Sequence, residues 1–131
     1  MNYLLDTSVF LLALSAPEKL NQRARELVSS ERSGIFLSAA SSWEIAIKYA
    51  LGKLDLPEAP ARYVPARMFG LRIQSLEITH SHALSAGELP LRHPDPFDRM
   101  LIAQAVAEEM VLATADRAFE KYGVELLWCG R

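Results

Sequence analysis

The stretch PDPFDRMLIAQAVAEEMVLATAD, residues 94–116, joins a helical pattern directly to a strand pattern. Asp95 is followed by a proline, which suits the first position of a helix, and apolar residues then recur with helical spacing as far as Met110. The apolar run at residues 111–114 is typical of a buried strand, and Asp116 lies just beyond it. A helix that leads at once into a buried strand is the repeating unit of an α/β protein.

The rest of the chain continues this alternation of short apolar runs and helical patterns. The predicted strands cover residues 2–5, 35–37, 72–78, 111–114 and 124–128. The predicted helices cover residues 8–14, 18–30, 42–51, 61–69, 79–86, 97–110 and 117–122. Strands that alternate with helices predict an α/β fold, here a three-layer α/β/α sandwich whose central parallel sheet has four to five strands.

Length and composition restrict the class of protein. The 131 residues are expected to form a single domain, residues 1–131, and a chain that is 50% hydrophobic and 23% charged is not expected to be disordered. The net charge of −2 argues against a simple basic nucleic-acid module. Cys129 is the single cysteine, which excludes an internal disulfide and any cysteine-based zinc site.

The sequence also predicts where the protein resides. Its longest unbroken apolar run, residues 9–14, is far too short to cross a membrane. The first residues carry no basic segment ahead of an apolar one, as a signal peptide would. We therefore expect a soluble cytoplasmic protein with no membrane partner.

Four carboxylates are predicted to meet at one edge of the sheet. Asp6 follows the first strand and Asp116 follows the fourth, while Glu44 and Asp98 lie in the first turns of two helices. In a parallel α/β sheet, ligands bind beyond the carboxyl ends of the strands. The four candidate catalytic and metal-ligating residues are therefore Asp6, Glu44, Asp98 and Asp116.

Each of these acids also has a purely structural interpretation as a helix cap. Ser41 and Glu44 have the spacing of a capping box, and Asp95 fits the N-cap of a helix with Asp98 at its third position. Asp6 and Asp116 precede predicted helices in the same way. Capping alone, however, requires neither four caps at one sheet edge nor acidic residues, because Ser, Thr and Asn cap as well.

A cluster of four carboxylates is expected to bind a divalent cation. Like charges at close range either keep some of the acids protonated or attract a neutralising cation. Oxygen ligands without clustered His or Cys favour Mg²⁺ or Mn²⁺, which can activate water for phosphodiester hydrolysis. Apart from these four acids, the 14 Lys and Arg residues outnumber the remaining Asp and Glu, which is compatible with attraction to phosphate.

Several neighbouring residues are weaker candidates for the site. Lys48 is expected to pair with Glu44 four residues earlier, or less often to contact a phosphate. Arg99 is expected to contact a phosphate or a nearby acid, and Asp95 and Thr114 are possible outer-shell groups. His93 fits a hydrogen-bonding role in its loop better than a catalytic role.

Three further residues are given ordinary structural roles. His80 and His82 are two positions apart and so do not share a helix face, and both are expected at the surface. Trp43 is expected to pack at the start of its helix, with Ile47 one turn further along.

Four motifs together resemble a known family. They are LLDTS at residues 4–8, SWEIAIK at 42–48, DPFDRMLIAQA at 95–105 and TAD at 114–116. In this order they resemble a PIN domain, and among PIN domains the chain is similar to the VapC toxins of type II toxin–antitoxin pairs. The resemblance covers nearly the whole chain, and the DPFDR segment is its most specific part.

The resemblance implies a metal-dependent endoribonuclease that hydrolyses RNA with Mg²⁺ or Mn²⁺. The family's acidic ligand positions match Asp6, Glu44, Asp98 and Asp116, and its hydroxyl beside the last acid matches Thr114. It also implies a homodimer and a protein antitoxin. From charge complementarity we expect the antitoxin to lay apolar side chains in a groove near the acids and to place an Arg or Lys among them.

Two other classes remain as alternatives. A haloacid-dehalogenase-like phosphatase also has an Asp after its first strand, but it needs a second carboxylate at the position of Ser8. A catalytically silent PIN-like protein-binding module would be signalled by the loss of a ligand acid, and none of the four is lost.

Overall fold

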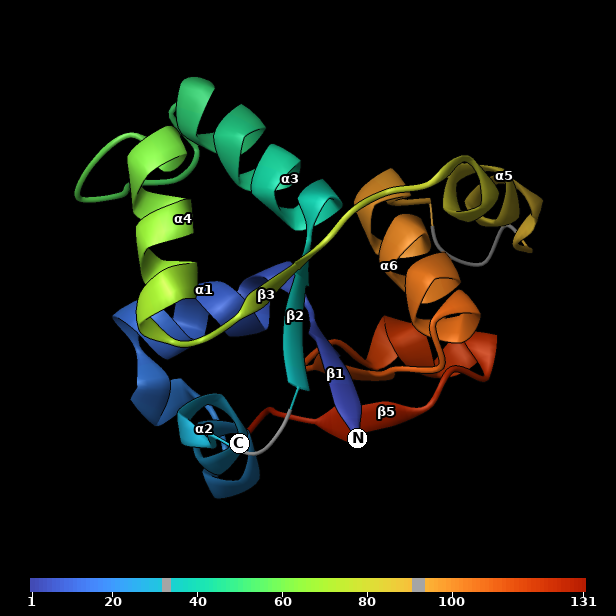
Figure 1. Cartoon of the computed structure of the whole chain (residues 1–131), viewed down its shortest axis with the longest axis horizontal. Helices are drawn as coiled ribbons and strands as arrows, with labels where there is room; N and C mark the ends of the chain where they lie inside the picture. The colour runs from blue at the N-terminus through green and yellow to red at the C-terminus, as the bar shows by residue number, and fades with distance from the viewer. Residues whose placement is uncertain (32–33, 91–93) are drawn as a thin grey trace.

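Five parallel strands form one sheet in the order β3-β2-β1-β4-β5 (Figure 1). The computed structural model of the chain describes residues 1–31, 34–90 and 94–131. The strands are β1 (Asn2–Leu5), β2 (Gly34–Ser38), β3 (Gln74–Leu76), β4 (Val111–Thr114) and β5 (Leu126–Trp128). The α-helices are α1 (Thr7–Ser15), α2 (Gln22–Ser29), α3 (Ala39–Ala50), α4 (Pro60–Gly70), α5 (His80–Glu88) and α6 (Pro96–Ala107), and the 3₁₀ helices are η1 (Pro17–Lys19) and η2 (Arg117–Tyr122).

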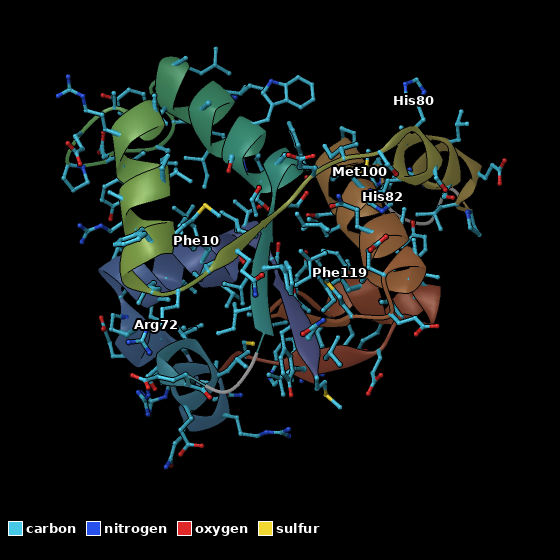
Figure 2. All side chains as sticks on the ribbon, viewed as in Figure 1. Phe10, Arg72, His80, His82, Met100 and Phe119 are labelled. Atoms are coloured by element: carbon cyan, nitrogen blue, oxygen red, sulfur yellow. The ribbon has the colours of Figure 1, made fainter. Side chains whose placement is uncertain are left out.

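The sheet separates two hydrophobic clusters, because successive side chains of a strand point to opposite faces. Leu5 belongs to the cluster that packs under α1, α2 and α4, and it shares this side with Phe10. Leu4 belongs to the cluster under α6 and η2, on the side of Phe119. Figure 2 shows Phe10 and Phe119 on these two sides. The predicted three-layer sandwich is confirmed, with five strands.

The predicted start of α3 was wrong. The helix begins at Ala39, and Ser38 is its N-cap, with the side-chain hydroxyl accepting a hydrogen bond from the Ala40 amide at 3.0 Å. Ser41 therefore lies inside the first turn, where its hydroxyl accepts a hydrogen bond from the Thr7 hydroxyl at 2.8 Å. The expected capping box of Ser41 and Glu44 does not form, so the Glu44 side chain serves another role.

The single helix expected at residues 18–30 is divided in two. Asn21 caps α2 by accepting a hydrogen bond from the Ala24 amide at 2.9 Å. Its side-chain amide also donates to the carbonyls of Trp128 and Gly130, at 2.8 and 3.2 Å. Asn21 therefore fixes the end of the last strand against the start of α2, a tertiary role that helical periodicity does not reveal.

Helices α5 and α6 are joined by buried polar contacts. Arg99 of α6 is buried, and its guanidinium donates hydrogen bonds to the carbonyls of Ala86, Leu89 and Pro90 at 2.8–2.9 Å. His82 of α5 is 2% exposed, with its Nε2 3.0 Å from a Glu108 carboxylate oxygen.

The surface position expected for His82 is therefore wrong. Its Nδ1 accepts a hydrogen bond from the Thr79 amide at 3.1 Å, which completes the cap of α5. His80 is exposed, as expected. Figure 2 shows His82 directed toward α6 and His80 directed away from it. Within the described ranges, none of the helices has the length and apolar character that crossing a bilayer requires.

Replacing Arg99 should destabilise the fold, since the change leaves carbonyls of the α5 end without their charged donor. For Arg99→Met we expect a loss of about 3 kcal/mol in the free energy of unfolding, measured by urea denaturation. The exposed Arg62 of α4 provides a control, and Arg62→Met should change stability by no more than about 0.5 kcal/mol. Equal, small effects of the two changes would contradict this role of Arg99.

Candidate active site

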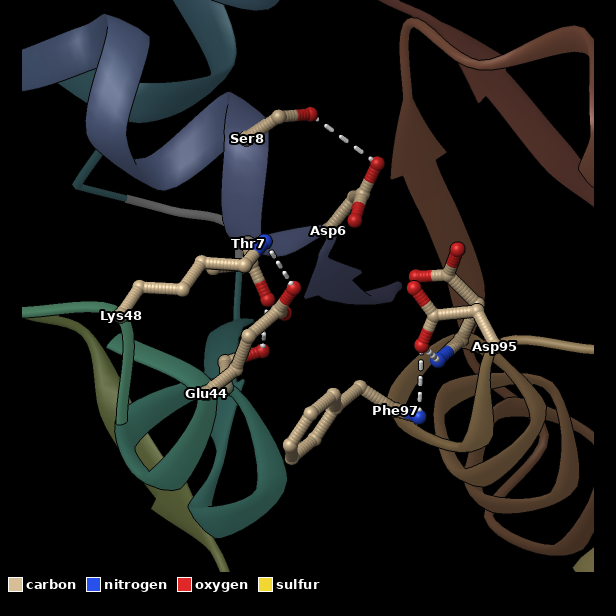
Figure 3. A network of polar contacts seen from close by, with 9 residues as sticks. Asp6, Thr7, Ser8, Glu44, Lys48, Asp95 and Phe97 are labelled. Carbon is tan, nitrogen blue, oxygen red and sulfur yellow. Dashed lines mark hydrogen bonds and ion pairs between the residues drawn. The ribbon is translucent and has the colours of Figure 1, made fainter. Parts of the chain in front are cut away.

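All four predicted acids line one pocket at the carboxyl edge of the sheet. The pocket has a volume of about 230 Å³, and Asp95 lines it as a fifth carboxylate. Figure 3 shows how Asp6, Glu44 and Asp95 approach this space from the end of β1, from α3 and from the start of α6. The five residues, which we call the acidic pocket, are Asp6, Glu44, Asp95, Asp98 and Asp116.

Asp6 is the most deeply held of these acids, with only 5% of its surface exposed. It occupies the N-cap position of α1, but its side chain makes no capping hydrogen bond to that helix. Its carboxylate accepts hydrogen bonds from the hydroxyls of Thr114 and Ser8, at 2.8 and 3.1 Å. Burial raises the pKa of Asp6, and the two hydrogen bonds offset only part of that effect.

Thr114 links the two strand ends that carry acids. Its hydroxyl donates to Asp6 at 2.8 Å and accepts a hydrogen bond from the Asp116 amide at 3.0 Å. Asp116 caps η2 by accepting from the Ala118 amide at 2.9 Å, so its predicted capping role is confirmed. A carboxylate has more acceptor sites than this one bond uses, so capping and lining the pocket are compatible.

The start of α6 supplies two acids with different roles. Asp95 is the N-cap, as predicted, and one of its oxygens accepts from the amides of Phe97 and Asp98 at 2.9 and 3.3 Å. Asp98 lies in the first turn of α6 and lines the pocket. Burial raises its pKa, and the negative charges of the other four acids of the pocket raise it further, to about 8.

Glu44 and Lys48 form the ion pair that their spacing predicted. Glu44 is 6% exposed and lies 2.7 Å from the ammonium nitrogen of Lys48, which is half-exposed. The hydrogen bond to Glu44 raises the pKa of Lys48. Of the described residues that line the pocket, Lys48 alone carries a positive charge.

Two other candidates do not join the site. Arg99 does not line the pocket, because its guanidinium is buried against the end of α5. The expectation that it contacts a phosphate or an acid of the site is not supported by this placement. His93 lies outside the described residues.

Sequence reasoning missed an aromatic contact beside the pocket. Trp43 is 62% exposed rather than packed, and its ring meets that of Phe97 edge-on, with centroids 5.4 Å apart. Each ring directly precedes an acid of the pocket, Trp43 before Glu44 and Phe97 before Asp98. This adjacency is visible in the sequence, but the contact between the two helices is not.

A larger apolar groove, of about 620 Å³, lies on the other side of α3. Ser42 and Ala46 of α3 line it, together with residues of α4 such as Pro60, Val64 and Met68. Glu44 and Lys48 face the acidic pocket from the same helix. Helix α3 thus separates an apolar groove from the acids.

The pocket has the donor chemistry of a site for a hard divalent cation. Burial and the repulsion among the charged oxygens both raise the pKa of Asp98, and its protonation is one way to relieve that repulsion. Cation binding is the other, and carboxylate oxygens favour Mg²⁺ or Mn²⁺. In the described parts of the chain, no three acids are already spaced as ligands of a single ion, so binding would have to draw the carboxylates closer together.

The chain is similar to known proteins in both sequence and structure. The sequence model of the PIN domain matches residues 3–125. Ribonuclease VapC16 of Mycobacterium tuberculosis is 48% identical over 67 residues, which are 51% of this chain and 47% of that protein. The match thus spans about half the length of this curated relative.

Solved structures show the same fold at low sequence identity. VapBC2 from Rickettsia felis, bound to a DNA fragment from its promoter, has a TM-score of 0.72 at 18% identity, covering 98% of this chain and 99% of that one. VapBC-1 from nontypeable Haemophilus influenzae has a TM-score of 0.65 at 18% identity, with 98% of both chains covered. A toxin–antitoxin complex from Klebsiella pneumoniae has a TM-score of 0.63 at 14% identity, with 95% of both covered.

The raised pKa of Asp98 predicts how stability depends on pH without metal. Between its ordinary pKa of 3.8 and about 8, the native chain binds a proton that the unfolded chain has lost. Stability therefore falls as pH rises through this window, by at most about 1.4 kcal/mol per pH unit for one proton. Thermal melts in EDTA should show a steeper decline for the wild type than for Asp98→Asn. Parallel pH profiles of the two proteins would contradict the raised pKa.

Proposed function

Because the chain belongs to the PIN domain family, we propose that it is a metal-dependent endoribonuclease and the toxin of a type II toxin–antitoxin pair. The observation that carries this proposal is the acidic pocket, in which five carboxylates meet at the carboxyl edge of a parallel sheet. The 48% identity to a protein named a ribonuclease, over half of the chain, supports the choice of RNA as substrate.

The proposed cofactor is Mg²⁺ or Mn²⁺, held directly or through water. When bound, such a cation supplies positive charge at the phosphodiester and lowers the pKa of water. The proposed ligands are Asp6, Glu44, Asp98 and Asp116.

Other residues of the site position these ligands. Thr114 holds Asp6 through its hydroxyl and the Asp116 loop through its contact with the amide, so it fixes the spacing of two ligands. Asp95 starts α6 and thereby places Asp98, and its lining of the pocket makes it an outer-shell group.

Lys48 is the proposed phosphate contact. Its ammonium group lines the pocket and is bound to Glu44 at 2.7 Å. A phosphate therefore has to compete with that carboxylate for the ammonium. A cation bound by Glu44 would neutralise the charge of this carboxylate and weaken its hold on the ammonium. Cation binding would therefore make Lys48 more available to a phosphate.

The alternatives have less support. Position 8 carries Ser8, whose hydroxyl donates to Asp6, rather than the second carboxylate that a haloacid-dehalogenase-like phosphatase needs two residues after its first Asp. A silent binding module would not need five acids in one pocket, because their repulsion destabilises the fold.

The proposed partners are RNA and a protein antitoxin, in the cytoplasm, with the toxin as a homodimer. One structural neighbour is described as a toxin–antitoxin complex, and two others as VapBC. The apolar groove suits an apolar antitoxin segment. Since only α3 separates it from the acidic pocket, a segment in the groove can carry an Arg or Lys around that helix to the carboxylates.

Cleavage of RNA should require both a divalent cation and the acids of the pocket. We expect the antitoxin-free protein to cut a labelled pool of random-sequence RNA oligonucleotides in Mn²⁺ or Mg²⁺. Asp98→Asn should slow cleavage by on the order of a hundredfold or more, because an amide cannot lose a proton and offer a negatively charged oxygen to the cation. The matched control is Asp55→Asn, at an exposed acid outside the pocket, and it should cut like the wild type.

Two results would overturn the proposal. Cleavage that persists in excess EDTA would exclude the metal-dependent mechanism. Equal activity of Asp98→Asn and Asp55→Asn would show that the acidic pocket is not the site of the reaction.

A further inference from the structure

Two aromatic side chains contact each other next to acids of the pocket, one on each of the helices α3 and α6, although neither ring lines the pocket itself. Trp43 is on α3 and Phe97 is in the first turn of α6, and each directly precedes a proposed ligand acid. Their rings are inclined at 76° with centroids 5.4 Å apart. We call this pair the aromatic rim. Figure 3 shows the Phe97 side chain reaching from α6 toward α3, near Glu44.

The exposure of Trp43 is not explained by packing. The indole is 62% exposed, although it is the kind of side chain that folding normally buries. Its contact with Phe97 is edge-to-face, which leaves ring surface uncovered. An uncovered aromatic surface beside a reactive pocket is suited to stacking on another flat ring.

Electrostatics near the pocket gives an RNA substrate little help. The chain has a net charge of −2, and the pocket holds five acids, so a polyanion is repelled there until a cation binds. The ammonium of Lys48 is paired with Glu44, and the guanidinium of Arg99 is buried against backbone carbonyls. Among the described residues, Lys48 alone offers positive charge at the pocket, so an interaction that does not depend on charge would add to the affinity there, and base stacking is one.

We propose that the aromatic rim stacks on the base of a nucleotide adjacent to the bond that is cut. This inference rests on the proposed ribonuclease function and names the feature of the RNA that the site binds. Stacking on Trp43 holds the neighbouring phosphate over the carboxylates, so Trp43 is a positioning residue. A base must be unpaired and unstacked to reach such a platform, so the substrate class is single-stranded RNA or a loop.

The test uses substrates and protein variants together. From the random-sequence pool, one short single-stranded RNA that the wild type cuts in Mn²⁺ is selected. It is then resynthesised with one base at a time removed and the sugar–phosphate chain kept. The variants are Trp43→Ala, Trp43→Phe and, as a matched control, Phe69→Ala, which removes an aromatic ring on α4 that is 88% exposed and does not line the acidic pocket.

For the wild type, loss of one base next to the cut should raise KM by about tenfold or more, with a smaller change in kcat. Trp43→Ala should raise KM by a similar factor on the intact RNA and should show no further rise with that abasic RNA. Trp43→Phe should restore most of the affinity, and Phe69→Ala should behave like the wild type. A melt confirms that each variant is folded.

The outcomes separate this inference from the proposed function. If the wild type cuts no RNA in Mn²⁺, the ribonuclease proposal itself fails. A second outcome is that the wild type cuts RNA while Trp43→Ala has the same KM as the wild type, both on the intact RNA and on each RNA that lacks one base. In that case only the stacking role is overturned. Light scattering would show whether Trp43→Ala changes the oligomeric state. If it does, and the KM values on the RNAs that lack one base stay as in the wild type, the stacking role is overturned and a second copy of the chain covers the indole.

Discussion

Repulsion among five carboxylates is the constraint around which this structure is organised. Burial and, after it, the neighbouring negative charges raise the pKa of Asp98 to about 8, so a further charge in the pocket is unfavourable. A fold without a use for these charges would gain stability by replacing one of them. Here the acids are instead held together against their repulsion by hydrogen bonds at strand ends and helix starts, which we call the frame of the pocket.

The hydrogen bonds and strand pairing of this frame keep the acids close together despite their repulsion. Thr114 ties Asp6 to the Asp116 loop through one hydroxyl, so two acids from different strands share a single anchor. The parallel register of β1 with β4 brings those strand ends to the same edge. Asp95 and Asp116 each use one oxygen to cap a helix. These two residues therefore cap a helix and line the pocket at once, so capping leaves room for the proposed role in the site.

Much of the site was predictable because it depends on topology. Once strands and helices alternate, the acids after β1 and β4 must lie at one edge, and the sequence places them without side-chain detail. The parts that were mispredicted depend on contacts between distant segments. Ser38 rather than Ser41 caps α3, Asn21 divides a helix to hold the last strand, and His82 is buried against α6. Arg99 fits a phosphate contact in the sequence, but its carbonyl partners on α5 are visible only in the fold.

The central claim we propose is that the acidic pocket binds a divalent cation as its carboxylates draw closer together. Calorimetric titration of Mn²⁺ into the metal-free chain near neutral pH, in buffers with different heats of ionisation, tests it most directly. Since Asp98 holds a proton under these conditions, binding should release up to about one proton per chain. Asp98→Asn should bind more weakly and release little. Mn²⁺ binding that releases no proton and is unchanged in Asp98→Asn would contradict the account.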